Sequence, residues 1–198
     1  MSPRKPASQE LTKEMILKEA RIQFVIKGYN QVSVRNIAKK LGCSHGSIYY
    51  HFKNKAELFY AIVEEDFSVL NKLVDETIHG DEDDEKKLII LFIRFIEFGL
   101  NHQNQYELMF MVRNDEVDSL SQEAAHLSYQ KFARAVQLLA NNQLAIKDIW
   151  SAFISLHGFV SHHWGYVDSF EEARDGAIAH VNFILIALFP TDDTLDDL

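Results

Sequence analysis

The chain has 198 residues, of which 47% are hydrophobic and 25% are charged, and this composition excludes a disordered protein. Its longest apolar run, residues 183–189, is too short to cross a membrane, and the N-terminus lacks the apolar stretch of a signal peptide. A single cysteine, Cys43, excludes an internal disulfide framework. We therefore expect a cytoplasmic protein with no membrane partner.

The charge is divided unevenly along the sequence. The formal net charge of −9 would by itself argue against a nucleic-acid partner. However, residues 1–60 hold eleven Lys and Arg against four Asp and Glu, a net charge of +7, whereas residues 61–198 hold nine against 25, a net charge of −16. This asymmetry predicts a basic, nucleic-acid-binding segment followed by an acidic domain.

The apolar residues recur with helical periodicity, which predicts an all-α fold of about nine helices and no strand. The expected helices cover residues 10–27, 34–41, 45–52, 55–77, 85–100, 106–112, 121–141, 146–166 and 170–189. The expected domains are an N-terminal domain at 9–69, a second helical domain at 70–189 and an acidic tail at 190–198.

Several helix ends carry recognisable capping residues. Gly28 is expected to end the first helix in the left-handed conformation that glycine tolerates. Ser33 and Ser44 are expected to cap the second and third helices with their hydroxyl groups. Residues 54–57 and 169–172 resemble capping boxes, which predicts the starts of the fourth and last helices.

Residues 33–52 have the pattern of a helix-turn-helix, in which two short helices are joined by a tight turn and the second enters the major groove. Gly42 permits the turn. The helix that follows begins with small polar residues and holds no large apolar side chain before Ile48, so its start is expected to be accessible to DNA. The pattern also places Phe52 in the core and Tyr50 toward DNA.

Residues 28–29, 33–38 and 42–55 resemble the DNA-binding domain of the tetracycline-repressor (TetR) family, over residues 9–69 as a whole. The resemblance implies a homodimer with a DNA-binding head and a variable ligand-binding body. It assigns phosphate contacts to Ser33, Tyr50 and Lys55. It assigns a position facing the groove or its bases to Ser44, His45, Gly46, Ser47 and Tyr49. His45 is unusual at its position, so no base preference is carried over.

The acidic part of the sequence is rich in large aromatic residues. Most of them are expected to be core, but ligand pockets are lined by the same side chains. The candidate ligand-binding residues are Phe92, Phe95, Tyr106, Phe110, Tyr129, Phe132, Trp150, Phe153 and His157. They favour a small hydrophobic or aromatic effector over a sugar or a metal.

The last two expected helices carry apolar residues on more than one side, which is typical of burial against a second subunit. The alternative is that a single subunit wraps these helices completely. The resemblance implies a two-fold interface that matches a palindromic operator. The candidate interface residues are Trp150, Ile154, Gly158, Ala177, Ile184 and Ala187.

We find no metal or cofactor motif in the sequence. His157, His162 and His163 lack the i, i+4 spacing of a helical metal pair, and Cys43 is expected to be a small buried residue rather than a redox switch. Nothing resembles a nucleophile elbow, a P-loop or a dinucleotide-binding motif, so we do not expect an enzyme. An enzyme is nevertheless the main alternative class, and a protein-interaction module is the third option. The preferred function is a repressor that leaves its DNA operator when it binds an apolar effector.

Overall fold

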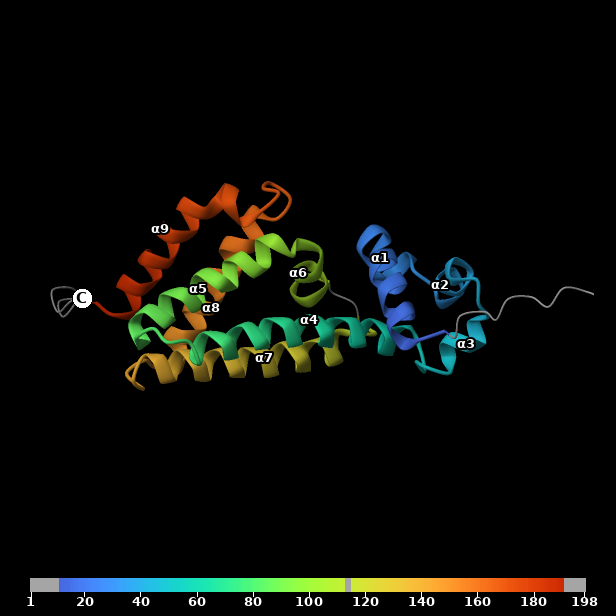
Figure 1. Ribbon diagram of the computed structural model, residues 1–198, viewed down its shortest axis with the longest axis horizontal. Helices are drawn as coiled ribbons and strands as arrows, with labels where there is room; N and C mark the ends of the chain where they lie inside the picture. The colour runs from blue at the N-terminus through green and yellow to red at the C-terminus, as the bar shows by residue number, and fades with distance from the viewer. Residues whose placement is uncertain (1–10, 113–114, 191–198) are drawn as a thin grey trace, which may run out of the picture. The chain divides into compact units, whose positions relative to one another are not determined.

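The computed structural model describes residues 11–112 and 115–190, so the expected domain start at residue 9 and the tail after residue 190 lie outside the described residues. Figure 1 shows the helices in chain order. They are α1 (Lys13–Gln31), α2 (Val34–Leu41), α3 (His45–Tyr49), α4 (Lys55–Ile78), α5 (Asp84–Asn101), α6 (Gln103–Phe110), α7 (Asp118–Leu139), α8 (Ile146–His163) and α9 (Phe170–Leu188).

Contacts divide the chain into two compact units. We call Met1–Glu65 together with Val112–Ser121 the head, and Asp66–Met111 together with Gln122–Leu198 the body. The first residues of α4 belong to the head and the rest of this helix belongs to the body. The functional domains expected from the sequence, a DNA-binding domain and a ligand-binding domain, remain a prediction.

The head is built around the apolar stripe of α1. Ile16, Ala20 and Phe24 follow one another at i+4 and are buried, as their spacing predicts. Phe24 meets the ring of Phe59 from α4 edge-on, with 5.2 Å between the ring centroids. Helix α2 packs against both α1 and α3, so these three helices share one small core.

The first helix does not end as expected. Gly28 has a positive φ of 72°, which requires glycine, but its ψ of 162° lies outside the left-handed helical region. The chain therefore leaves the helical path at Gly28 and forms one more turn over residues 29–31. At the start of α1, the Thr12 hydroxyl accepts a hydrogen bond from the Met15 N–H at 3.2 Å.

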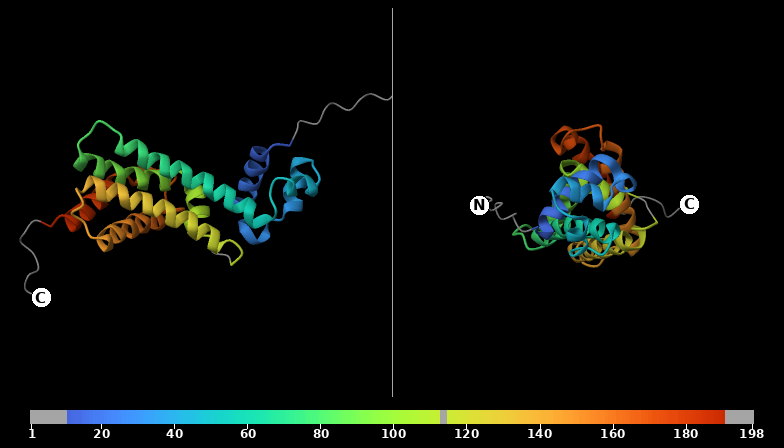
Figure 2. Two further views of the ribbon diagram at one scale, coloured as in Figure 1. Left: turned by 90° about the horizontal axis from the view of Figure 1, so that it is seen from below. Right: turned by 90° about the vertical axis from the view of Figure 1, so that its right-hand side faces the viewer.

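In the body, α5 lies at the centre and packs against α6, α8 and α9. Most of its circumference is buried, as its few polar residues predict. The long helices α4 and α7 run side by side (Figure 2), where the Ser128 hydroxyl donates to Asn71 Oδ1 at 2.9 Å and Lys131 pairs with Asp75. These polar contacts fix the register of α7 along α4.

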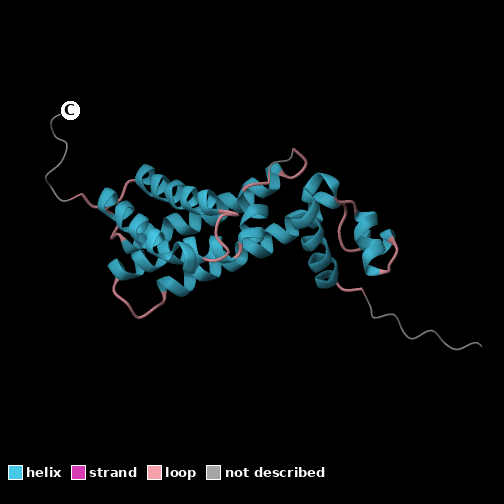
Figure 3. Cartoon of the chain, turned by 90° about the horizontal axis from the view of Figure 1, so that it is seen from above, coloured by secondary structure: helices cyan, strands magenta, loops and turns pink. Residues whose placement is uncertain are grey.

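The all-α prediction is confirmed, because the described residues form helices and loops without a strand (Figure 3). None of the helices in this part of the chain is long and apolar enough to span a membrane.

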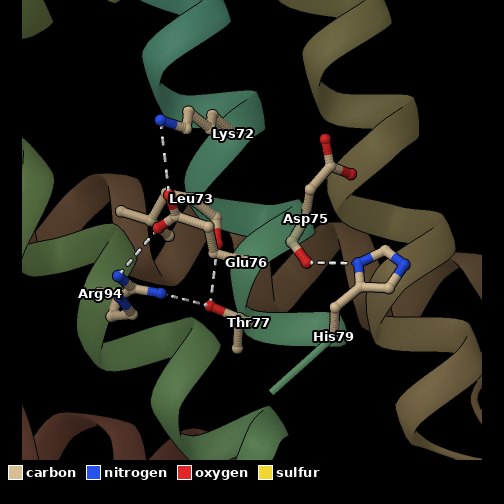
Figure 4. A network of polar contacts seen from close by, with 7 residues as sticks. All are labelled: Lys72, Leu73, Asp75, Glu76, Thr77, His79 and Arg94. Atoms are coloured by element: carbon tan, nitrogen blue, oxygen red, sulfur yellow. Dashed lines mark hydrogen bonds and ion pairs between the residues drawn. The ribbon is translucent and has the colours of Figure 1, made fainter.

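Helix α5 makes a close backbone approach to α8 and polar side-chain contacts with α4. Gly99 faces α8 so closely that a Cβ atom there would lie 2.5 Å from a methyl carbon of Val160. Arg94 reaches α4, where it donates to the Thr77 hydroxyl at 3.1 Å and pairs with Glu76 at 3.3 Å (Figure 4). Thr77 is buried and donates in turn to the Leu73 carbonyl at 2.9 Å, so its hydroxyl is satisfied in both directions.

The predicted capping box of α9 is wrong in part. Ser169 precedes α9 but makes no capping hydrogen bond with its side chain. The Phe170 N–H instead donates to Asn101 Oδ1 at 2.9 Å, and Glu172 accepts from the Asp168 N–H at 3.3 Å. The cap of this helix therefore comes from a residue of α5 that lies far away in the sequence.

Candidate nucleic-acid interface

The turn between α2 and α3 is a helix-turn-helix turn. Ser33 caps α2 by accepting from the Asn36 N–H at 3.2 Å, as predicted. Gly42 ends α2 in the left-handed conformation, with φ 68° and ψ 24°, and the Cys43 N–H returns to the Ala38 carbonyl at 3.0 Å. The chain is thereby redirected within a few residues, which separates the supporting helix from the next one. Cys43 itself is half-buried rather than buried.

The start of α3 presents small polar groups to solvent. The Ser44 hydroxyl accepts from the Ser47 N–H at 3.1 Å and lies 2.8 Å from the Ser47 hydroxyl. His45 and Gly46 are exposed, while Ile48 on the opposite side is buried in the head. Helix α3 is therefore anchored by one apolar side chain and offers the opposite side of its first turn to a ligand.

The aromatic residues after Ile48 divide as predicted between core and surface. Phe52 is buried, whereas Tyr50 is 88% exposed and Tyr49 is 48% exposed. The His45 ring meets Tyr49 edge-on, with 6.1 Å between the centroids. The helix itself is shorter than expected, because it ends at Tyr49 rather than near residue 52.

Lys55 begins α4 beside this surface, and the predicted capping box forms in part, because Asn54 caps the helix while Glu57 returns to the residue before the cap. Asn54 Oδ1 accepts from the Glu57 N–H at 2.7 Å, and Glu57 accepts from the Lys53 N–H at 2.6 Å. The Lys55 ammonium donates to the Tyr29 carbonyl at 3.2 Å and lies 3.9 Å from the centroid of the Tyr29 ring. The sequence assigned Tyr29 no role in the site, since it lies 26 residues away from Lys55.

Further positive charge is exposed on the head. Arg35, Lys39 and Lys40 on α2 are exposed, and so is Lys53 in the loop before α4. Long cationic side chains on a helix-turn-helix attract the phosphate backbone without reading sequence. The head therefore exposes a neutral, polar helix start and also cationic side chains on α2 and before α4.

The structure brings the nine candidate ligand-binding residues of the body together. Each ring lies within 6.0 Å, centroid to centroid, of another ring of the set. The cluster extends from Phe92 and Phe95 in the core to Trp150, which is partly exposed. These rings pack against one another and together form a continuous aromatic region.

One polar pair lies inside this aromatic region. The Tyr106 hydroxyl is 2.6 Å from His157 Nδ1, and Tyr106 is fully buried. Burial raises the pKa of the Tyr106 phenol, so the hydroxyl stays neutral and shares a hydrogen bond with the imidazole. The pair gives an otherwise apolar region a group that can orient a bound molecule.

Two hollows of the body lie away from the aromatic region. The first, of 420 Å³, is lined by residues of α5, α7 and α9, including Leu88, Leu139 and Leu185. The second, of 200 Å³, lies between α8 and α9 and includes Ser155 and Phe183. None of the nine aromatic candidates lines either hollow.

The candidate interface residues fall into two groups. Ala177 and Ile184 are buried in the chain's own core, which argues against direct contact with a partner. The outer side of α8 and α9 instead exposes large apolar residues that follow helical spacing. The exposed residues of this outer face are Trp150, Ile154, Gly158, Phe183, Ile186 and Ala187.

The histidines of α8 make local contacts. His163 Nδ1 donates to the Phe159 carbonyl at 2.9 Å, and His162 lies beside His163 with 5.1 Å between the ring centroids. Among the described residues, no group of three or more His, Cys, Asp or Glu side chains is arranged to hold a metal ion.

Comparisons with known proteins agree with this geometry. Residues 16–62 match the family of bacterial regulatory proteins described as the tetR family. The Transposon Tn10 TetC protein of Escherichia coli is 25% identical over 169 residues, which cover 83% of this chain and 84% of TetC. The transcriptional repressor AcnR of Corynebacterium diphtheriae is 35% identical over 66 residues, which cover 33% of this chain and 35% of AcnR, so this likeness spans about a third of AcnR.

Solved structures share the fold at lower identity. FadR from Bacillus subtilis, in complex with stearoyl-CoA, superposes with a TM-score of 0.69 at 18% identity and covers 90% of this chain and 98% of its own. A tetR-family regulatory protein from Rhodococcus RHA1 has a TM-score of 0.68 at 19% identity, with 91% and 98% covered. The match over residues 16–62 shows that the helix-turn-helix of this chain is a DNA-binding domain of the tetR family of bacterial regulatory proteins, and the likenesses to solved structures show that the whole chain has the same fold.

Proposed function

We propose that this regulator binds a two-fold DNA operator as a homodimer and represses transcription until an apolar effector releases it. The observation that carries the proposal is the start of α3, where Ser44, His45, Gly46 and Ser47 are capped into place above the buried Ile48. A helix start with small polar groups is suited to approach base edges in the major groove.

The contacts with DNA divide into two kinds. Ser33, Tyr50 and Lys55 hold phosphates, while Tyr49 and the start of α3 face the groove. Tyr50 carries an exposed hydroxyl, and Ser33 stands at the N-terminus of α2, where backbone N–H groups also attract phosphate. In this arrangement His45 is the residue whose ring nitrogens are available for a base.

The dimer forms through the outer face of α8 and α9. Phe183 is 67% exposed, and Trp150, Ile154 and Ile186 are also exposed on this face. Exposed large apolar side chains of this kind are costly in a monomer when they adjoin one another, and a symmetric interface would cover them. Such a dimer would place two α3 helices about 34–36 Å apart, one turn of DNA.

The effector binds in the body, in or beside the aromatic region. Aromatic rings with a few polar groups are typical of sites for hydrophobic small molecules, and the Tyr106–His157 pair supplies the polar group. FadR, which shares the fold, binds stearoyl-CoA, so molecules with a long apolar chain are the first class to test. Repression follows by similarity to AcnR, and effector binding would shift the dimer to a state that fits the operator less well.

The proposal is tested by titrating the purified protein against a labelled fragment of its own upstream region and against an unrelated duplex. We expect affinity for both duplexes to fall steeply with salt because phosphate contacts release counterions, while preference for the upstream fragment persists. A protein-interaction module would bind neither duplex at any salt concentration, and that result would contradict the proposal.

Two substitutions test the division of roles. Lys55→Ala should weaken binding to all sequences about equally, whereas His45→Ala should change the preference among operator variants. If the two variants behave alike, the assignment of phosphate and base contacts is wrong.

The effector claim needs its own assay. Fatty acids, their CoA thioesters and aromatic hydrophobes are added to the preformed complex with the upstream fragment. We expect at least one class to release the protein from DNA. Unchanged operator affinity across all three classes would contradict release by an apolar effector and leave DNA binding intact.

A further inference from the structure

Tyr29 occupies a fixed position in the head. Its side chain is only 4% exposed, it stacks on Phe24 with 5.7 Å between the centroids, and it meets Phe59 edge-on at 5.1 Å. The backbone also constrains the ring, because Gly28 redirects the chain immediately before it. A ring packed on two sides has little freedom to turn, so its remaining face is presented in one orientation.

Lys55 lies on that remaining face. Its ammonium group is 3.9 Å from the ring centroid and donates to the Tyr29 carbonyl oxygen at 3.2 Å. An ammonium group has three N–H donors, and these two contacts leave it able to donate to a further acceptor. A free lysine side chain would sample many rotamers and lose that freedom on binding, whereas this one is already placed.

Glu116 holds the other end of Tyr29. The phenol donates to Glu116 Oε2 at 2.8 Å, and both residues belong to the head, although Glu116 lies between α6 and α7 in the sequence. Burial, followed by the hydrogen bond to Glu116 and the charge of that carboxylate, raises the pKa of the Tyr29 phenol. The phenol therefore remains a donor at neutral pH. A hydrogen bond to a carboxylate also makes the ring face more negative, which strengthens its attraction for a cation.

We propose that Tyr29 is a positioning residue for DNA binding, which sets the Lys55 ammonium at the start of α4, and that Glu116 supports Tyr29 in this role. The inference rests on the proposed function, in which Lys55 contacts a phosphate. Neither Tyr29 nor Glu116 touches DNA in this arrangement. Both act through the position and mobility of one ammonium group.

The experiment is a double-mutant cycle on the full chain. Tyr29→Phe, Glu116→Gln and Lys55→Ala are made singly, and each of the first two is combined with Lys55→Ala. Affinity for the upstream fragment and for an unrelated duplex is measured over a series of salt concentrations. Tyr166→Phe, at an exposed tyrosine of the body, is the matched control, and thermal unfolding shows that each variant is folded.

We expect Tyr29→Phe and Glu116→Gln to weaken binding to both duplexes by about two- to fivefold, and to have no further effect once Lys55 is alanine. The plot of log affinity against log salt has a negative slope. Lys55→Ala should make this slope less steep by about 0.9, the value of one phosphate contact. A purely structural role for Tyr29 would give the same loss with and without Lys55, and that result overturns the inference. Lack of any effect in the single variants overturns it as well.

The same data separate the inference from the proposed function. If the unmodified protein binds neither duplex, the proposed function fails. If the protein binds DNA and Lys55→Ala has no effect, the DNA-binding proposal stands, but the phosphate role of Lys55 and the positioning role of Tyr29 both fall.

Discussion

In the head, helices of eight and five residues are fixed by side-chain caps from the residue directly before them, whereas in the body α8, with 18 residues, and α9, with 19, receive no such bond from the residue before them. A short helix gains little from its own backbone hydrogen bonds, so Ser33 and Ser44 contribute directly to whether α2 and α3 form. A long helix is stabilised instead by the apolar face that it buries. The head is therefore governed by local polar contacts, and the body by packing between residues far apart in sequence.

The largest effect is expected from a substitution that disrupts the proposed dimer interface of the body and leaves the head unchanged. Phe183→Asp places a charge on the exposed outer face of α9, where an uncompensated charge would be buried in a dimer. We expect the protein to become monomeric and its operator affinity to fall by at least about tenfold, because the second head no longer adds to binding.

Light scattering measures the mass, and DNA titration measures the affinity. Arg174→Asp, at an exposed position nearer the start of the same helix, serves as the control because it also introduces an aspartate into α9. A dimeric Phe183→Asp protein with normal operator affinity would show that the outer face is not the interface.

Next in size is a change in the packing of the body. Gly99→Ala would put a methyl group 2.5 Å from one methyl carbon of Val160 and 2.9 Å from the other, so the Val160 side chain or the two helices must shift. We expect the free energy of unfolding to fall by about 1–3 kcal/mol, the usual range for overpacking.

Chemical denaturation checks this value. Gly176→Ala is the matched control, since a methyl group there would meet only ring atoms of Phe159, the nearest at an ordinary distance of 3.7 Å. If Gly99→Ala is as stable as the control, the close approach of α5 and α8 is not as the structure has it.

A smaller effect is expected from a cap of the head. Asn54→Ala removes the acceptor of the Glu57 N–H at the start of α4, and the loss of such a cap costs about 1 kcal/mol. Because the lost bond is adjacent to Lys55, we also expect weaker binding to DNA of any sequence.

Denaturation and DNA titration are measured on the same preparation. Asn104→Ala, at an exposed asparagine of α6 in the body, provides the comparison. Equal stability of the two variants would contradict the view that local caps hold the head.

The smallest effect on DNA binding is expected at the buried polar pair of the body. Tyr106→Phe keeps the ring and removes the hydroxyl that is hydrogen-bonded to His157, which is itself only half-buried. We expect a loss of about 1 kcal/mol of stability and a changed response to effectors, with DNA binding in their absence unchanged. A variant that loses DNA binding without effector would show that the pair serves the head instead.

Local contacts could be predicted from the sequence, whereas contacts between distant residues could not. The caps at Ser33, Ser44 and Asn54 were predictable because donor and acceptor lie within three residues of each other. The end of α3 was not, because Phe52 continues the apolar pattern although the chain has already left the helix by that residue.

Contacts between distant residues were beyond reach of any local pattern. Asn101 caps α9 from 69 residues away, and Lys55 meets Tyr29 from 26 residues away. In α9, the apolar residues on its different sides look alike in the sequence, and only the packing shows that Ala177 and Ile184 face the core while Phe183 faces outward. Apolar periodicity identifies a helix face but not what covers it.

The central claim is that two copies of the head, each reading with α3, bind one two-fold operator. Footprinting of the upstream fragment, at a salt concentration that suppresses binding to unrelated DNA, tests this claim most directly. The account predicts two symmetric protected half-sites whose centres lie about one helical turn apart, roughly 34–36 Å. Protection of a single half-site, or of none while the protein is folded and dimeric, would contradict it.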